Sequence, residues 1–206
     1  MILLTFRLQA LELCRIKYQG GGDWYNDPEV LPNLAREITK RTGIKVSEQQ
    51  RELDLSDQAL FSCPFLFLTG HGNIKLDGDE LERLRKYLEN GGFLYADDDY
   101  GMDQSFRLLL KKVFPDKELL PLPADHAIYK IFYRLEGLPK IHVHDGKPPQ
   151  GFGIFEKGKM VVFYTYESNI SDGWADPGTH NDPENLREQS FQMGVNIFYY
   201  ALCGSE

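Results

Sequence analysis

The sequence has few cysteines, no long apolar run and no excess of positive charge. Its 206 residues include three cysteines, and a chain of this length can bury a core without disulfides or a structural metal. No apolar stretch approaches the ~20 residues that a membrane-spanning helix needs, so we expect no membrane span. The formal net charge of −8 argues against a nucleic-acid partner, because such proteins usually present a basic face. Hydrophobic residues at 42% and charged residues at 26% exclude a disordered or fibrous chain.

The three cysteines predict a reducing environment. Cys14 and Cys203 lie in apolar stretches and Cys63 stands just before a strand-like run, so we predict three buried free thiols. Free thiols favour a cytoplasmic protein. The opening residues lack a cationic segment and a small-residue cleavage site and so do not predict a signal peptide. Export would require a longer N-terminus.

Predicted strands alternate with predicted helices along the chain. The clearest helix begins at Asp77, which forms a capping box with Glu80, and ends before Gly91. Two more helices are predicted over residues 30–41 and 103–113, and a last one begins with Asp182 as N-cap and Pro183 at the first helical position. The predicted strands are 11–18, 64–69 and 93–96, followed by a hairpin of 152–155 and 160–166. This alternation predicts one three-layer α/β domain over residues 1–206 with a mostly parallel sheet. Residues 115–149 hold six of the eleven prolines and predict a loop-rich insertion.

Polar clusters follow four of the predicted strands. Because ligands bind at the carboxyl ends of strands in open α/β sheets, we expect these clusters to meet at one edge. They are residues 20–27, 70–73 and 97–101, and after the last strand 167–169, 172–174 and 180–182.

Two of these clusters suggest chemistry. In Asp97-Asp98-Asp99, strand alternation would direct one or two carboxylates to a hard cation or a sugar hydroxyl, while another caps the following helix. His71 lies between two glycines, which would leave its imidazole accessible as a ligand or a general acid/base. His71, Asp98 and Asp99 are therefore the catalytic candidates. The alternative is a capped helix and a turn whose histidine bonds a neighbouring loop.

A second histidine pattern lies in the insertion. His142 and His144 share one face of an extended segment and would bind Zn or Mn with a carboxylate from elsewhere. His180 and Asp98 are further candidate metal ligands, so a divalent metal is the one cofactor that we consider. Histidines two apart also occur by chance.

Four aromatic residues suggest a polar small-molecule ligand. Trp24, Tyr25, Tyr100 and Trp174 would offer flat faces to a sugar ring, with the Asp23 carboxylate bonding its hydroxyls. Alternatively, these rings only close loops over the sheet edge. The triple glycine at 20–22 fits neither phosphate-binding motif and predicts a turn in which two backbones approach closely.

Several longer motifs resemble a known family. These are Arg15-Ile16-Lys17-Tyr18 with the following Gly-Gly-Gly-Asp-Trp-Tyr, Thr69-Gly70-His71-Gly72-Asn73, Gly91-Gly92-Phe93-Leu94-Tyr95-Ala96-Asp97-Asp98 and His142-Val143-His144-Asp145-Gly146. Together they resemble a family of uncharacterised bacterial proteins, a domain of unknown function, over about residues 15–202. The resemblance implies a class I glutamine amidotransferase-like, flavodoxin-like fold. Amidotransferases place a catalytic cysteine in the turn that here is 96–100, and this turn has no thiol, so we expect no glutaminase activity.

Three functions remain open from the sequence. The first is a domain that binds a small polar ligand such as a carbohydrate through Asp23, Trp24, Tyr25, His71, Asp98, Asp99, Tyr100 and Trp174. The second is a metal-dependent hydrolase that uses His71, Asp98 or Asp99, and His144 or His180. The third is a scaffold that docks another protein and has no small-molecule site.

Overall fold

The computed structural model describes residues 10–204, and a seven-stranded sheet runs through this part of the chain. The strand order is β2-β1-β3-β4-β7-β6-β5, and the first five strands are parallel. Their bounds are β1 (Leu13–Lys17), β2 (Arg51–Asp54), β3 (Phe65–His71), β4 (Leu94–Tyr100), β5 (Leu120–Pro121), β6 (Gln150–Glu156) and β7 (Lys159–Tyr166). The hairpin of β6 and β7 is antiparallel, as predicted. The opening stretch, which bears on a signal peptide, lies outside the described residues.

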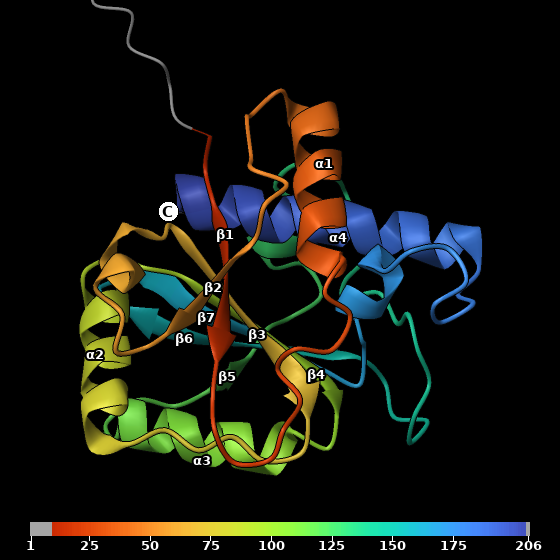
Figure 1. The fold of residues 1–206 in the computed structure, drawn as a ribbon. Helices are drawn as coiled ribbons and strands as arrows, with labels where there is room; N and C mark the ends of the chain where they lie inside the picture. Colours follow the sequence, from red (N-terminus) through yellow and green to blue (C-terminus); the bar gives the residue numbers. More distant parts are fainter. Residues whose placement is uncertain (1–9, 205–206) are drawn as a thin grey trace, which may run out of the picture.

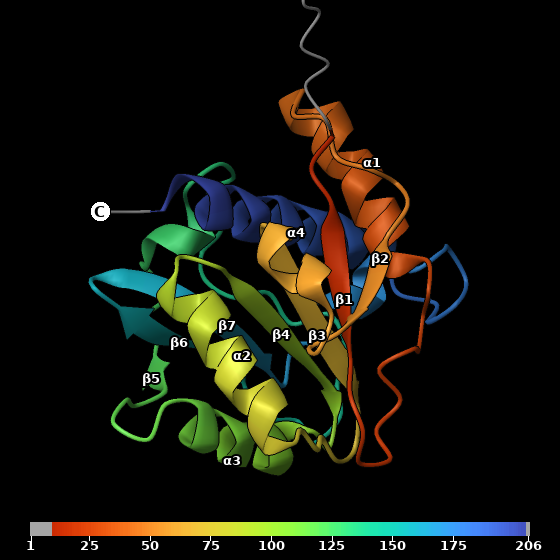
Figure 2. The same ribbon diagram turned by 60° about the vertical axis from the view of Figure 1, so that its left-hand side comes forward.

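Helices cover both faces of the sheet (Figure 1). The 60° turn in Figure 2 brings α2 in front of the strands and leaves α4 behind them. The helices are α1 (Val30–Thr42), α2 (Gly78–Glu89), α3 (Asp103–Val113) and α4 (Glu184–Cys203), with 3₁₀ turns η1 (Gln58–Ser62), η2 (Ala127–Tyr129) and η3 (Ser171–Trp174). One core lies between the sheet and α2 with α3, and a second between the sheet and α1 with α4. The expected three-layer α/β arrangement is confirmed. Within residues 10–204, no helix has the length and apolar character to cross a membrane.

The predicted N-cap is correct for α2 and wrong for α4. Asp77 accepts a hydrogen bond from the Glu80 N–H while the Glu80 side chain accepts one from the Asp77 N–H, so the predicted capping box is confirmed. Helix α4 begins one residue later than predicted. Pro183, with ψ 141°, is its N-cap, and no side chain caps it.

Strand β4 is longer than predicted and contains all three aspartates. The expectation that Asp97–Asp99 follow the strand is wrong, because the backbone goes on pairing with β3 as far as His71 opposite Tyr100. The register shifts between Gly70 and His71 at the end of this pair. Bulges of this kind often lie beside functional sites, where they redirect a side chain.

The prediction of three buried free thiols is wrong. Cys14 in β1 and Cys63 before β3 form a disulfide, and Cys203 is exposed. The two half-cystines meet because β1 and β3 are neighbours in the sheet, with Leu13 opposite Phe65. The argument from free thiols to a reducing compartment therefore no longer holds.

The proline-rich segment between α3 and β6 returns to the edge of the sheet. It contains β5 and η2 and then runs past the residues that follow β7. There the Ile141 N–H donates to the Ser168 carbonyl (2.9 Å), and the Ser168 hydroxyl donates to the Pro139 carbonyl (2.6 Å). These bonds attach residues 140–147 to the carboxyl ends of the parallel strands.

Candidate functional site

The loop after β1 is held by a buried guanidinium. Arg15 is 1% exposed and donates to the backbone carbonyls of Trp24 (3.0 Å), Asn26 and Asp27 (3.0 Å). Removing these bonds would leave a buried charge without acceptors, so the loop conformation is strongly determined. Arg15 thereby fixes where Asp27 stands.

Two glycines let this loop approach the end of β3. A Cβ on Gly70, whose φ is +140°, would lie 2.3 Å from the Tyr18 hydroxyl oxygen. One on Gly22 would lie 2.8 Å from the His71 carbonyl oxygen. The predicted close-approach turn is confirmed at Gly22. Asp23 reaches β3 across this contact.

His71 lies between two carboxylates at the end of β3. Its Nδ1 is 3.0 Å from Asp23 Oδ2 and 3.4 Å from Asp99 Oδ2, and Asp23 also accepts the His71 backbone N–H. The His71 side chain is 49% exposed, whereas the Asp99 side chain is 6% exposed. The imidazole is thus oriented by buried or half-buried acids and still reaches solvent, as a proton-transferring group must.

Because side chains alternate along a strand, the three aspartates of β4 make different contacts. Asp97 accepts from the Ser171 N–H (2.6 Å) and hydroxyl (2.7 Å) and from Thr165, so it holds η3 against the sheet. Asp98 accepts from the backbone N–H of Met102 (2.8 Å), the residue just before α3, but no side chain among the described residues caps this helix, so the expected capping role is wrong. Asp99 faces the polar cluster at the strand ends.

Side chains from the loop after β7 complete that cluster. The fully buried Asn169 amide donates to Asp99 Oδ1 (3.0 Å) and to Asp172 Oδ2 (3.2 Å). A second amide, Asn26, donates to Asp99 Oδ2 from the loop after β1. The carboxylates of Asp99 and Asp172 are therefore held together by amides from two loops that are distant in sequence.

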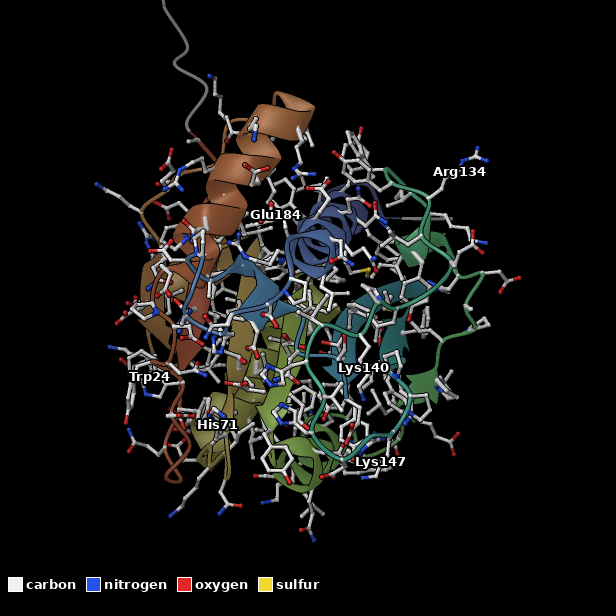
Figure 3. The ribbon with its side chains drawn as sticks, turned by 90° about the vertical axis from the view of Figure 1, so that its right-hand side faces the viewer. Trp24, His71, Arg134, Lys140, Lys147 and Glu184 are labelled. Atoms are coloured by element: carbon white, nitrogen blue, oxygen red, sulfur yellow. A yellow bond between two sulfur atoms is a disulfide. The ribbon has the colours of Figure 1, made fainter. Side chains whose placement is uncertain are left out.

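Two histidines reach this cluster from the far side. His142 Nδ1 lies 3.4 Å from Asp172 Oδ2, so the insertion does cover the strand ends. His180 pairs through Nε2 with Asp27 Oδ2 (2.9 Å) and places Nδ1 4.0 Å from Asp172 Oδ2. Figure 3 shows Trp24 and His71 at one side of this edge and Lys140 and Lys147, on the loop that contains His142, at the other.

These residues form two sets with the spacing of metal ligands. One is His142, Asp172 and His180, and the other is Asp27, Asp99 and Asp172; in each set the ligand atoms lie within 4.8 Å of one another. A further set among the described residues, Glu12 with Cys14 and Cys63, contains the disulfide sulfurs, which are not thiolates. The two sets at the strand ends share Asp172.

Burial and neighbouring groups shift the pKa values of four residues in the cluster. Burial, with Asp99 close by, raises the pKa of Asp172 to about 8. Burial raises the pKa of Asp99 as well, and His71 opposes this shift. The hydrogen bond to Asp27 raises the pKa of His180 to about 9, and the same bond lowers the pKa of Asp27. Perturbed groups gathered in one cleft are typical of functional sites.

The backbone is strained at the same place. Asp27, Glu167, Asn169 and Asn181 have φ between 43° and 58°, the left-handed region that residues other than glycine seldom adopt. Such conformations persist only where the surrounding structure imposes them, and they concentrate at functional sites. All four residues belong to the loops that build the cluster.

A polar cavity of about 360 Å³ adjoins the cluster and shares Asp99 and Asn169 with it. Tyr100 lines this cavity and is 48% exposed. Its ring stacks on His144 (centroids 4.5 Å apart) and its hydroxyl donates to Asp145 (3.1 Å). The remaining lining residues are Asp98, Gly101, Asp103, Gln104, Tyr166 and Glu167. A lining this rich in carboxylates suits a hydroxyl-rich or cationic molecule and opposes an anionic one.

Three of the expected ligand-binding aromatics do not line this cavity. Trp174 is fully buried in the core under α4, where its indole N–H donates to the Ser190 carbonyl (2.9 Å), so its ring has no free face. Trp24 packs partly against the other core and lies beside Lys17, and Tyr25 is exposed next to it. Tyr100 is the aromatic candidate that lines the cavity.

The sequence pattern identified the segments that build the cluster, but it selected only some of the residues within them. His71, Asp99, His142 and His180 lie in or beside it, as expected, and His144 lies at the adjoining cavity. Asp27, Asn169 and Asp172 were within the polar segments but had not been selected. The strand-end rule that chose the segments was the available signal for them.

A family model matches residues 12–202, and its description is Domain of unknown function (DUF4159). No curated protein matches the chain.

Proposed function

The chain belongs to this family, the Domain of unknown function (DUF4159), and from the geometry of its strand-end cluster we propose that it is a metal-dependent hydrolase. The observation that carries the proposal is the set of His142, Asp172 and His180. Two imidazoles and a carboxylate are a common ligand set for Zn²⁺ and similar ions, and such sites keep one position open for water. A divalent ion bound there would lower the pKa of its water and supply the nucleophile.

The neighbouring residues have the positions that this chemistry requires. Asp27 bonds His180 Nε2 (2.9 Å), which leaves Nδ1 toward Asp172, the arrangement in which a carboxylate orients a metal-binding imidazole. His71, oriented by Asp23, is available to donate a proton to a leaving group. The adjoining cavity would hold a polar, hydroxyl-rich substrate.

Metal binding tests the proposal directly. Protein treated with chelator and then dialysed against Zn²⁺ or Mn²⁺ should retain bound ion, measured by mass spectrometry of the metal and by calorimetry. Asp172→Asn should lower the affinity about 100-fold, because it removes a ligand charge and keeps the shape. Metal-dependent hydrolysis of a panel of chromogenic esters and glycosides should disappear in the same variant.

Asp98→Asn is the matched control. It makes the same change in a buried aspartate of β4 whose carboxylate accepts the Met102 N–H just before α3 and belongs to neither ligand set. It should keep the metal content of the unsubstituted protein. Protein that retains no ion, or an equal loss in both variants, would contradict the proposal. His142→Ala, on a partly exposed side chain, repeats the test without disturbing the core.

A second candidate function is binding of a carbohydrate without hydrolysis, favoured by the half-exposed Tyr100 ring in a cavity of carboxylates and amides. Neutral mono- and oligosaccharides should then raise the melting temperature, and Tyr100→Ala should weaken binding about tenfold. Tyr25→Ala is the control, since this exposed ring lies outside the cavity lining. Equal affinities for both variants would reject this candidate. A protein that takes neither sugar nor metal would leave a docking scaffold.

We also propose the flavodoxin-like class for the fold. The five parallel strands have the order β2-β1-β3-β4-β7, which corresponds to the flavodoxin-like order 2-1-3-4-5. In that order ligands bind where β1 and β3 diverge, and Asp23 meets His71 at this point. The segment 96–100 has no thiol, so glutaminase chemistry is not part of the proposal.

The Cys14–Cys63 disulfide favours an oxidising compartment. Disulfides persist in secreted, periplasmic or surface proteins and are rare in the cytosol. We therefore propose export in place of the cytoplasmic location expected from the sequence.

A further inference from the structure

Asp172 belongs to both ligand sets of the cluster, and this sharing suggests more than one ion. The first set, with His142 and His180, offers two nitrogens and a carboxylate. The second, with Asp27 and Asp99, offers carboxylate oxygens alone. We propose that the strand ends hold a pair of divalent cations bridged by Asp172. This inference rests on the proposed metal site and adds a second ion to it.

Histidines are the charged partners of the second set. Within residues 10–204, no lysine or arginine side chain lies within salt-bridge distance of Asp27, Asp99 or Asp172. Their close partners are histidines and amides. Asp99 and Asp172 are buried, and buried carboxylates are normally paired or coordinate a metal, so these two acids, with Asp27 in reach, favour a cation among them.

An unsatisfied amide oxygen provides independent support. Asn169 is fully buried, and its Oδ1 has no hydrogen-bond partner while its Nδ2 touches both Asp99 and Asp172. Leaving a buried acceptor unpaired costs about 1–3 kcal/mol. Asn169 Nδ2 also donates to the Asp99 backbone carbonyl (2.6 Å), which fixes the orientation of the amide, so Oδ1 is a buried acceptor that is still open to a cation. Asn26 Oδ1 is likewise buried and unpaired beside Asp99.

The two sets differ in the ions that they prefer. Imidazole nitrogens suit Zn²⁺ and Mn²⁺, and an all-oxygen set suits Mg²⁺, Ca²⁺ and Mn²⁺. Paired ions about 3.5–4 Å apart stabilise both the attacking and the leaving oxygen in a hydrolysis. The pair would therefore bind the water and the scissile group of one substrate together, with the rest of the substrate in the cavity beside Asp99 and Asn169.

Manganese alone is the probe, because Mn²⁺ accepts both ligand sets and is paramagnetic. Calorimetry and metal analysis of the full chain should give two ions, and electron paramagnetic resonance should show the multiline spectrum of a coupled pair. Asp99→Asn and, separately, His142→Ala should each reduce the count to one and abolish the coupling. Asp98→Asn should keep two coupled ions.

Each outcome separates the two proposals. One ion in the unsubstituted protein overturns the pair and leaves the single-site hydrolase standing. No ion overturns both. Two ions without coupling, or two that survive in Asp172→Asn, overturn the bridge. If Asp99→Asn does not fold, His142→Ala decides alone, because that residue lies on a surface loop and is partly exposed.

Discussion

Replacing Cys14 and Cys63 together with alanine is expected to lower the free energy of unfolding by about 4 kcal/mol. The disulfide joins residues 49 positions apart, and closing a loop of that length restricts the unfolded chain by roughly this amount in the chain-entropy model. For a chain of this size the loss corresponds to a melting temperature lower by roughly 8–16 °C. Calorimetry and urea denaturation of the double variant measure both quantities.

Cys203→Ala is the control for the disulfide, because this exposed thiol lies outside it. That variant should melt within a degree or two of the unsubstituted protein. The intact mass before reduction should show one alkylated cysteine without denaturant and still one with denaturant. Three alkylated cysteines in denatured protein from an oxidising preparation, or a double variant of unchanged stability, would refute the bond.

The disulfide illustrates what the sequence could not reveal about this fold. Periodicity and capping predicted the helices, and the apolar run at 64–69 predicted a buried strand, because these are local properties. Whether Cys14 approaches Cys63 depends on strand order, since only neighbouring strands bring their residues within a few ångströms. Strand order is set by packing over the whole sheet, and no local signal reports it.

For the candidate site, too, the sequence predicted which segments meet but not which of their side chains point inward. Parallel strands bring their carboxyl ends to one edge, so the polar segments could be expected to meet. Which side chains point inward depends on the last turn of each loop. In the segment 172–174 the conspicuous residue is Trp174, yet η3 turns its indole into the core and presents Asp172 to the cluster. The length of β4 decided the roles of its three aspartates in the same way.

Asp98→Asn is expected to stabilise the protein at pH 8 by about 4 kcal/mol. Burial raises the pKa of Asp98 to about 7, against an ordinary value of 3.8. Between these two values the unfolded chain has released this proton and the folded chain keeps it, so this group makes stability fall as the pH rises from about 4 to 7. A pKa raised from 3.8 to about 7 corresponds to about 4 kcal/mol. An asparagine carries no charge and its oxygen can still accept the Met102 N–H.

The dependence of stability on pH distinguishes the loss of the Asp98 charge from a change in packing. Urea denaturation of both proteins in chelator should give nearly equal stabilities at pH 4, a growing advantage of Asp98→Asn up to pH 7, and a constant one above it. Asp116→Asn, on an exposed aspartate, should track the unsubstituted protein throughout. A difference that does not change between pH 4 and 8 would mean that Asp98 ionises in the folded protein as easily as in water. The same variant should keep its metal, because Asp98 belongs to neither ligand set, so one substitution separates the stability cost of burying this aspartate from the proposed binding role of Asp99 beside it.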